Sequence, residues 1–145
     1  MSISSNRMPN GGLIDRNRRL SFRFNGRSYI GHPGDTLASA LLANGIRLVA
    51  RSIKYHRPRG VVTAGFEEPN GLVQLLGASE EPNVRMTCLP LTDNLEVESV
   101  NCWPGLRFDL GALNDRISRA IPAGFYYKPS CGVLGLPMQG SSVEP

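Results

Sequence analysis

Apolar and polar side chains alternate strictly near the start of the chain, which is the pattern of a half-buried β-strand. In residues 20–24, a leucine and two phenylalanines occupy one face, and a serine and an arginine occupy the other. Asn25-Gly26 follows directly, and this dipeptide is the strongest short signal for a hairpin turn. Residues 27–31 then supply the returning strand. The pattern therefore predicts an N-terminal β-hairpin.

A helix is predicted next, because apolar residues recur at helical spacing between positions 37 and 44. Asp35 or Thr36 is suited to cap its N-terminus, since either side chain accepts a hydrogen bond from a free amide of the first turn. Gly45 is suited to end it, since glycine adopts the left-handed conformation without strain. Alanine and leucine dominate the segment, so we expect a broad buried face.

Five further stretches have strand character, because they are short, apolar or alternating, and bounded by turn residues. They are residues 46–49, 61–63, 72–76, 84–88 and 95–99. Residues 109–119 instead show helical spacing, with apolar side chains at positions 110, 113 and 117. This order predicts an α+β fold, in which a mixed sheet packs against one main helix and a C-terminal helix follows.

The overall composition adds limits on size and location. The chain has 145 residues, of which 41% are hydrophobic and 19% charged, and this is enough for one domain with its own core. No apolar run approaches the roughly 20 residues of a membrane span. The polar segment from Met1 to Asn10 lacks the apolar core of a signal peptide. We therefore expect a cytoplasmic protein with no membrane partner.

The cysteines point to a reducing environment. Cys88, Cys102 and Cys131 are odd in number and have no C-x-x-C spacing, so we expect reduced thiols rather than a disulfide framework. Cys88 falls on the apolar side of an expected strand. We therefore expect it to be a buried core residue.

The most distinctive chemistry lies in the segment from Arg51 to Gly60, called here the basic loop. Five of the sixteen Lys and Arg residues fall within residues 47–59, and no Asp or Glu occurs in residues 36–66. A basic run is often only a solvated face, but arginine binds carboxylate and phosphate through paired hydrogen bonds. Proline and glycine give the segment a defined shape. The candidate anion- or partner-binding residues are Arg51, Lys54, Tyr55, His56, Arg57, Arg59 and Gly60.

No residue in the sequence is identified as catalytic, cofactor-binding or metal-ligating. His56 has cationic neighbours, so we expect it to pack or to donate a hydrogen bond rather than to act as a base or a metal ligand. Glu67 and Glu68 are expected to form a solvated turn that offsets the charge of the basic loop. The sequence contains no G-x-G-x-x-G, so it has no Rossmann phosphate loop.

Nucleic-acid binding is the alternative that a basic, aromatic-containing loop leaves open. The sequence has no RRM, helix-turn-helix or zinc motif, and the basic loop offers only Tyr55 for base stacking. We therefore do not expect a nucleic-acid partner.

Several motifs, taken together, carry a resemblance to a known family. They are Gly12 to Arg16, Gly34 to Gly45, Arg51 to Gly60, Glu68-Pro69-Asn70, Asn101-Cys102-Trp103-Pro104, Phe108-Asp109, and Ala123 to Lys128. In this order they closely resemble the N-terminal part of the α subunit of heterotetrameric sarcosine oxidase. Related bacterial amine and opine dehydrogenases share parts of the pattern, and a separately encoded small subunit of such an enzyme is the alternative.

The resemblance implies a β-grasp domain of the [2Fe–2S] ferredoxin-like type, preceding a much larger dinucleotide-binding domain and a T-protein-like domain. It implies as partners a flavin-bearing β subunit and γ and δ subunits. The full complex is expected to demethylate sarcosine oxidatively to glycine, with FAD, FMN and NAD as cofactors. This chain is expected to bind none of them, because it has no Rossmann phosphate loop. It is also expected to be inactive alone, because amine oxidation in the family occurs on the β subunit. The basic loop is expected at the junction with the flavin-binding parts.

Some relatives with this fold carry a [2Fe–2S] cluster, which needs four thiolates in the plant-type spacing C-x4-C-x2-C with a distant fourth. The first three positions fall near Thr63, Glu68 and Gly71, and none is cysteine. Cys88 lies near the fourth. Because one thiolate cannot hold the cluster, we expect no [2Fe–2S] cluster, and an iron–sulfur electron carrier is disfavoured.

The resemblance also divides the chain. We expect a flexible arm at residues 1–12, the β-grasp domain at 13–128, and an irregular tail at 129–145. The family leads us to expect Thr-Phe-Met-Trp after Lys128, but the chain has Pro-Ser-Cys-Gly. The codons ACC TTC ATG TGG, shifted by one base, give CCT TCA TGT GG, which encodes those four residues. We interpret the tail as frameshifted and the chain as a truncated copy; a true small subunit is the alternative.

Overall fold

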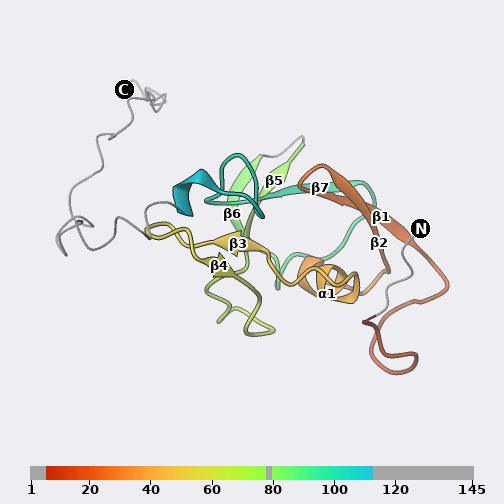
Figure 1. Ribbon diagram of the computed structural model, residues 1–145. Coiled ribbons are helices and arrows are strands. Elements are labelled where there is room, and N and C mark those ends of the chain that lie inside the picture. The colour runs from red at the N-terminus through yellow and green to blue at the C-terminus, as the bar shows by residue number, and fades with distance from the viewer. Residues whose placement is uncertain (1–5, 78–79, 113–145) are drawn as a thin grey trace, which may run out of the picture.

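The computed structural model describes residues 6–77 and 80–112 of the chain (Figure 1). Its centre is a five-stranded sheet with the strand order β2-β1-β7-β5-β6. The strands are β1 (Leu20–Phe24), β2 (Arg27–Gly31), β5 (Leu72–Leu76), β6 (Glu81–Arg85) and β7 (Leu95–Ser99). β1 and β7 run parallel, and the other neighbouring pairs run antiparallel. The sheet is therefore mixed, as the sequence predicts.

The predicted hairpin and helix are both present. β1 pairs with β2 so that Phe22 lies opposite Tyr29. Helix α1 (Leu37–Ala43) follows and lies below these two strands (Figure 1). Thr36 is the N-cap: its hydroxyl accepts a hydrogen bond from the Ser39 amide, and the Ser39 hydroxyl accepts one from the Thr36 amide. This capping box satisfies backbone donors that the first turn leaves free. A mixed sheet with one helix across it confirms the α+β, β-grasp prediction.

The core lies between α1 and the facing side of the sheet. Alternate residues of a strand point to opposite faces, so β1 buries its two phenylalanines and exposes Ser21 and Arg23. The largest fully buried apolar side chains are Phe22, Leu37, Leu41, Val49, Val73, Met86 and Val97. Each side chain of this size stabilises the fold by about 1.5–3 kcal/mol when buried. Local alternation thus determines which face of the sheet forms the core.

Two short strands form a separate ribbon instead of the strands predicted at residues 46–49 and 61–63. β3 (Ala50–Arg51) pairs antiparallel with β4 (Pro58–Arg59). The strand predicted at residues 46–49 in fact begins only at Ala50, and residues 61–63 form no strand. Both stretches were too short for an apolar pattern to define their ends.

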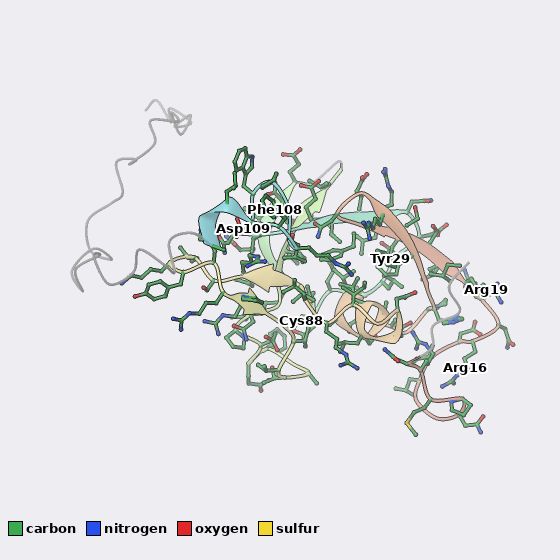
Figure 2. All side chains as sticks on the ribbon, viewed as in Figure 1. Arg16, Arg19, Tyr29, Cys88, Phe108 and Asp109 are labelled. Atoms are coloured by element: carbon green, nitrogen blue, oxygen red, sulfur yellow. The ribbon has the colours of Figure 1, made fainter. Side chains whose placement is uncertain are left out.

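The strand predicted at residues 84–88 was also misplaced, and the prediction for Cys88 was wrong. β6 ends at Arg85, and the amides of Cys88 and Leu89 both donate to the Arg85 carbonyl, which turns the chain. Met86 is fully buried within that turn, whereas Cys88, which is labelled in Figure 2, is exposed. Apolar alternation continued through the turn, so it could not show where the strand stopped.

The described residues end in a short 3₁₀ helix, Leu110–Ala112. The rest of the helix predicted at 109–119 lies outside the described residues, as do the motif at 123–128, Cys131 and the tail at 129–145. Within the described part of the expected arm, the Arg7 guanidinium donates to both Asp35 carboxylate oxygens at 3.0 and 2.7 Å. Among the described residues, no helix is long and apolar enough to cross a membrane.

Candidate functional site

The basic loop is a β-hairpin whose two arms are β3 and β4. Ala50 pairs with Arg59, and the Ser52 amide donates to the Arg57 carbonyl at 3.0 Å. His56 adopts a positive φ of 51° at the tip. Gly60 follows β4 where the chain passes close to Arg47: a Cβ at Gly60 would lie 2.7 Å from the Arg47 carbonyl oxygen. Glycine is therefore needed where the hairpin returns.

Tyr55 lies close to two cations on the outer part of this hairpin. The Lys54 ammonium and the Arg57 guanidinium each lie 5.0 Å from the centre of its ring. Such contacts hold a cation against the face of an aromatic ring. Arg57 and Arg59 are exposed, and Lys54 and Tyr55 are half-buried. The hairpin thus presents a positively charged outer surface with one aromatic side chain.

Arg51 and His56, in contrast, turn inward toward Asp109. Asp109 has a fully buried side chain that accepts a hydrogen bond from His56 Nδ1 at 2.7 Å, and Arg51 Nε lies 3.5 Å from the same carboxylate oxygen. Arg51 also donates to the Leu106 and His56 carbonyls. These two side chains of the basic loop therefore fasten the hairpin to the segment after β7. The expected hydrogen-bonding role of His56 is present, and its partner is Asp109.

Asp109 is ionised in this arrangement. Burial raises its pKa, but hydrogen bonds from the Trp103 amide, His56 and the Gly111 amide together lower that pKa below its ordinary value. A carboxylate only accepts hydrogen bonds, so Nδ1 of His56 carries the proton. The sequence analysis names Asp109 only within the motif Phe108-Asp109 and does not predict its contact with His56, because the two residues lie 53 positions apart and no local pattern links them.

Glu68 also departs from the expected solvated turn. Glu67 is exposed as predicted, but Glu68 is only 1% exposed. Its Oε2 accepts hydrogen bonds from the amides of Val62 and Thr63 at 2.8 and 2.7 Å. Its Oε1 accepts from the amides of Asn70 and Gly71 at 2.8 and 3.2 Å. The prediction for Glu68 was therefore wrong: it binds the backbone of its own loop.

The same loop bears the positions where a [2Fe–2S] cluster would be held in the plant-type spacing. Those positions, Thr63, Glu68 and Gly71, offer a hydroxyl, a carboxylate already bound by amides, and no side chain. A Cβ at Gly71 would lie 3.0 Å from Cγ of both Glu68 and Met86. Across residues 6–77 and 80–112, no group of three or more His, Cys, Asp and Glu side chains could hold a metal ion. The residues present do not fit the cluster.

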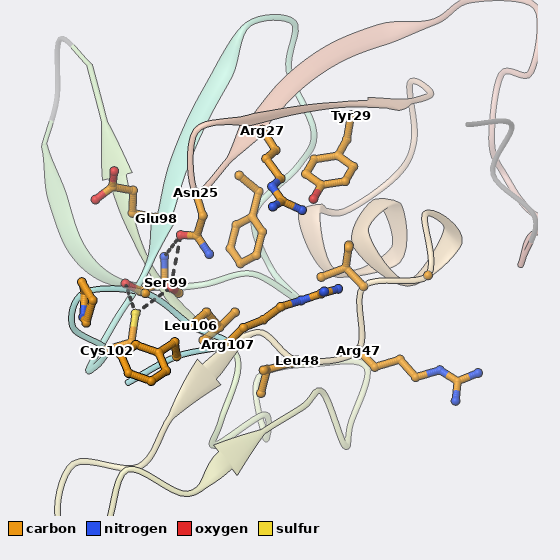
Figure 3. Close-up of a pocket in the computed structure, with 16 residues that line it drawn as sticks. Asn25, Arg27, Tyr29, Arg47, Leu48, Glu98, Ser99, Cys102, Leu106 and Arg107 are labelled. Atoms are coloured by element: carbon orange, nitrogen blue, oxygen red, sulfur yellow. Dashed lines mark hydrogen bonds between the residues drawn. The ribbon is translucent and has the colours of Figure 1, made fainter. Parts of the chain in front are cut away.

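A hollow of about 550 Å³ lies elsewhere, between the β1–β2 hairpin and the segments at 45–48 and 102–108. Arg27, Tyr29 and Arg107 are among the residues that line it, and Figure 3 shows the first two descending from β2 toward the Arg107 side chain. The exposed ring of Phe108 lies on its border. No sequence pattern predicts this hollow, because its lining residues come from three segments that are far apart in the chain.

The fold and the loops define a class: a β-grasp domain of the ferredoxin type whose cluster loop lacks thiolate ligands. Residues 17–102 match the family described as "2Fe-2S iron-sulfur cluster binding domain", and the chain belongs to that family. It is 58% identical over 127 residues to the sarcosine oxidase subunit alpha of Rhizobium meliloti (strain 1021), covering 87% of this chain and 13% of that protein.

A second relative and one solved structure are also similar. The sarcosine oxidase subunit alpha of Corynebacterium sp. (strain U-96) is 37% identical over 91 residues, which is 63% of this chain and 9% of that protein. The crystal structure of L-proline dehydrogenase from P. horikoshii aligns with a TM-score of 0.47 and 21% identity, covering 66% of this chain and 18% of that chain. The two named subunits confirm the resemblance to sarcosine oxidase α subunits. The chain spans only 13% and 9% of their lengths.

Proposed function

We propose that this chain is a non-catalytic β-grasp domain of a heterotetrameric sarcosine oxidase α subunit. The observation that carries this proposal is the 58% identity to such a subunit over 87% of the chain. The domain would span residues 13–128, with an arm at 1–12 and a frameshifted tail at 129–145. The chain would act in the cytoplasm, and sarcosine would be demethylated by the full complex.

The partners would be the rest of the α subunit, the flavin-bearing β subunit, and the γ and δ subunits. FAD, FMN and NAD would belong to that complex and not to this chain. The [2Fe–2S] cluster of other family members would be missing, since the loop at Thr63, Glu68 and Gly71 lacks thiolates. Support for a structural role comes from Arg51 and His56, because both side chains are bound to the buried Asp109 carboxylate.

The basic loop would contact the flavin-bearing part through its outer residues. Lys54, Arg57 and Arg59 supply the positive charge on the outer part of the hairpin, and the Tyr55 ring lies against the first two of them. Arg51, His56 and Gly60 would set the shape of the hairpin from within. Cations of this kind suit phosphate groups or an acidic protein surface.

A domain exchange tests the proposal. The segment of the Rhizobium meliloti α subunit that aligns with residues 13–128 is replaced by residues 13–128 of this chain, which keeps Asp109 with the hairpin that it holds. The hybrid is expressed with its partner subunits. We expect an assembled complex with normal flavin content and sarcosine-dependent hydrogen peroxide formation. The unaltered enzyme is the control. A hybrid subunit that folds but does not assemble with its partners contradicts the proposal.

A further inference from the structure

The loop from Gly60 to Gly71 closes around a single side chain. The amides of Val62 and Thr63 approach the Glu68 carboxylate from the beginning of the loop. The amides of Asn70 and Gly71 approach it from the end. The Thr63 hydroxyl adds a longer contact of 3.4 Å. Two ends of one loop are therefore held together by the two oxygens of one carboxylate.

This arrangement is a built anion site, because several backbone N–H groups converge on one point from which water is excluded. Inward-pointing amides are a recurring way of binding an anion in a turn. A [2Fe–2S] cluster with its four thiolates is also anionic, and hydrogen bonds to its sulfurs stabilise it. Glu68 stands at the second ligand position of the C-x4-C-x2-C spacing. The amide cage and the cluster position therefore coincide.

We propose that the Glu68 carboxylate replaces the iron–sulfur cluster as the anion around which this loop folds. The carboxylate compensates for the missing thiolates by giving the backbone amides a permanent internal partner. The loop then keeps a defined shape without iron. This inference goes beyond the role in sarcosine oxidase, because it concerns the chain alone and needs no other subunit.

The space around Glu68 supports this role. Its Cγ lies close enough to Gly71 that a Cβ there would be 3.0 Å away, so the glutamate stem occupies room that a third cysteine would need. Burial raises the pKa of Glu68, but the four backbone hydrogen bonds outweigh it and lower that pKa below its ordinary value. The side chain is thus an anion under ordinary conditions, as the cage requires.

The organised loop is connected to the core by two further contacts. The Thr87 hydroxyl donates to the Gly65 carbonyl at 2.9 Å, and the Met86 amide donates to the Gly71 carbonyl at 2.9 Å. The Met86 carbonyl in turn accepts from the Ala38 amide at the start of α1. Because this path runs from the loop to the helix, loss of the anion affects the loop first and the helix only indirectly.

Amide hydrogen exchange on the full 145-residue chain tests the proposal. The variant is Glu68→Gln, and the matched control is Glu67→Gln, which removes the same charge from the exposed neighbour. We expect exchange at Val62, Thr63, Asn70 and Gly71 to accelerate about tenfold or more in the first variant, since charged hydrogen bonds are lost. The control should leave these rates unchanged. Equal effects of the two variants, or no effect of Glu68→Gln, overturn the proposal.

A pH titration of the unsubstituted chain, followed by NMR, tests the same proposal and does not require that Glu68→Gln folds. The amide proton shifts of the same four residues should move together with one midpoint, below the ordinary pKa of a glutamate. Four unrelated titrations, or no titration, contradict a common carboxylate partner. Anaerobic incubation with ferrous iron and sulfide should give no visible cluster absorbance. A stoichiometric cluster formed in this chain would show that the carboxylate has not replaced it.

Discussion

His56 Nδ1 lies 2.7 Å from the buried Asp109 carboxylate, and this bond joins the tip of the basic loop to the segment after β7. The two residues are 53 positions apart. The same carboxylate accepts from two backbone amides and faces Arg51 at 3.5 Å. Asp109 is therefore the point on which the hairpin depends for its orientation.

Replacing Asp109 by asparagine should loosen the hairpin and destabilise the protein. Asp109→Asn keeps the size of the side chain but leaves Arg51 and His56 without their anion. We expect a loss of about 2 kcal/mol in the free energy of unfolding, measured by urea denaturation. Glu98→Gln, at an exposed position, is the control and should change it by less than about 0.5 kcal/mol. If both variants change the free energy of unfolding equally, the contacts of Asp109 with Arg51 and His56 do not stabilise the fold.

A methyl group at Gly111 should break the same contact from the other side. A Cβ there would overlap the His56 ring, with Nε2 only 2.6 Å away. Gly111→Ala must therefore push the ring off Asp109, at a cost of about 1–3 kcal/mol. The measurement is the thermal unfolding midpoint together with the His56 ring shifts in an NMR spectrum. Gly105→Ala is the control, since a Cβ there meets only the Phe108 carbonyl at 3.9 Å. An unmoved His56 resonance in Gly111→Ala would refute this packing.

Acid should destabilise the fold through three carboxyls that are buried in the part of the chain that the structure describes. Burial raises the pKa of Asp35, Glu68 and Asp109, but hydrogen bonds outweigh burial, so each pKa lies below its ordinary value. For Asp35 the main hydrogen bonds are those from Arg7 and Ser39. Each folded pKa is below its unfolded value, so the unfolded chain binds more protons as the pH falls. Their contribution is complete above the ordinary carboxyl pKa of about 4 and is lost as the pH falls through the folded values.

Urea denaturation at a series of pH values measures this effect. The free energy of unfolding should be level near neutrality and fall steeply in acid. Glu68→Gln should flatten the acid slope, because one of the three carboxyls no longer titrates, and Glu67→Gln should not. A slope that both variants leave unchanged would exclude Glu68 as a source of the acid sensitivity.

Elements defined by neighbours in sequence were predictable from the sequence. β1, β2, β5 and β7 lie at the predicted residues, because alternation and turn residues act over a few positions. The helix ends were also clear, since Thr36 and Gly45 act locally. Turns within apolar stretches could not be predicted in this way. For that reason Cys88 was expected in the core, although it is exposed.

The polar contacts were less accessible, because charge pattern alone does not show which side chains are buried. Arg51 and Arg59 look alike in the sequence, yet the first is bound to Asp109 and the second is exposed. Glu67 and Glu68 are adjacent and differ in the same way. For Glu68 a local signal exists, since its amide partners lie within six positions. Its position in the C-x4-C-x2-C spacing, where the second thiolate would stand, is a further signal in the sequence.

The outer charges of the basic loop give the prediction that bears on assembly. In the hybrid α subunit, Arg57→Ala with Arg59→Ala should weaken association with the flavin-bearing part, because both side chains are exposed at the hairpin and attract an anionic surface over about one Debye length. We expect a several-fold loss of assembled complex by size-exclusion chromatography, and this loss should shrink at high salt. Arg18→Ala with Arg19→Ala removes the same charge from exposed positions far from the hairpin in sequence, and assembly should persist. If both pairs weaken assembly equally, net charge and not the hairpin is responsible, and the assigned contact is wrong.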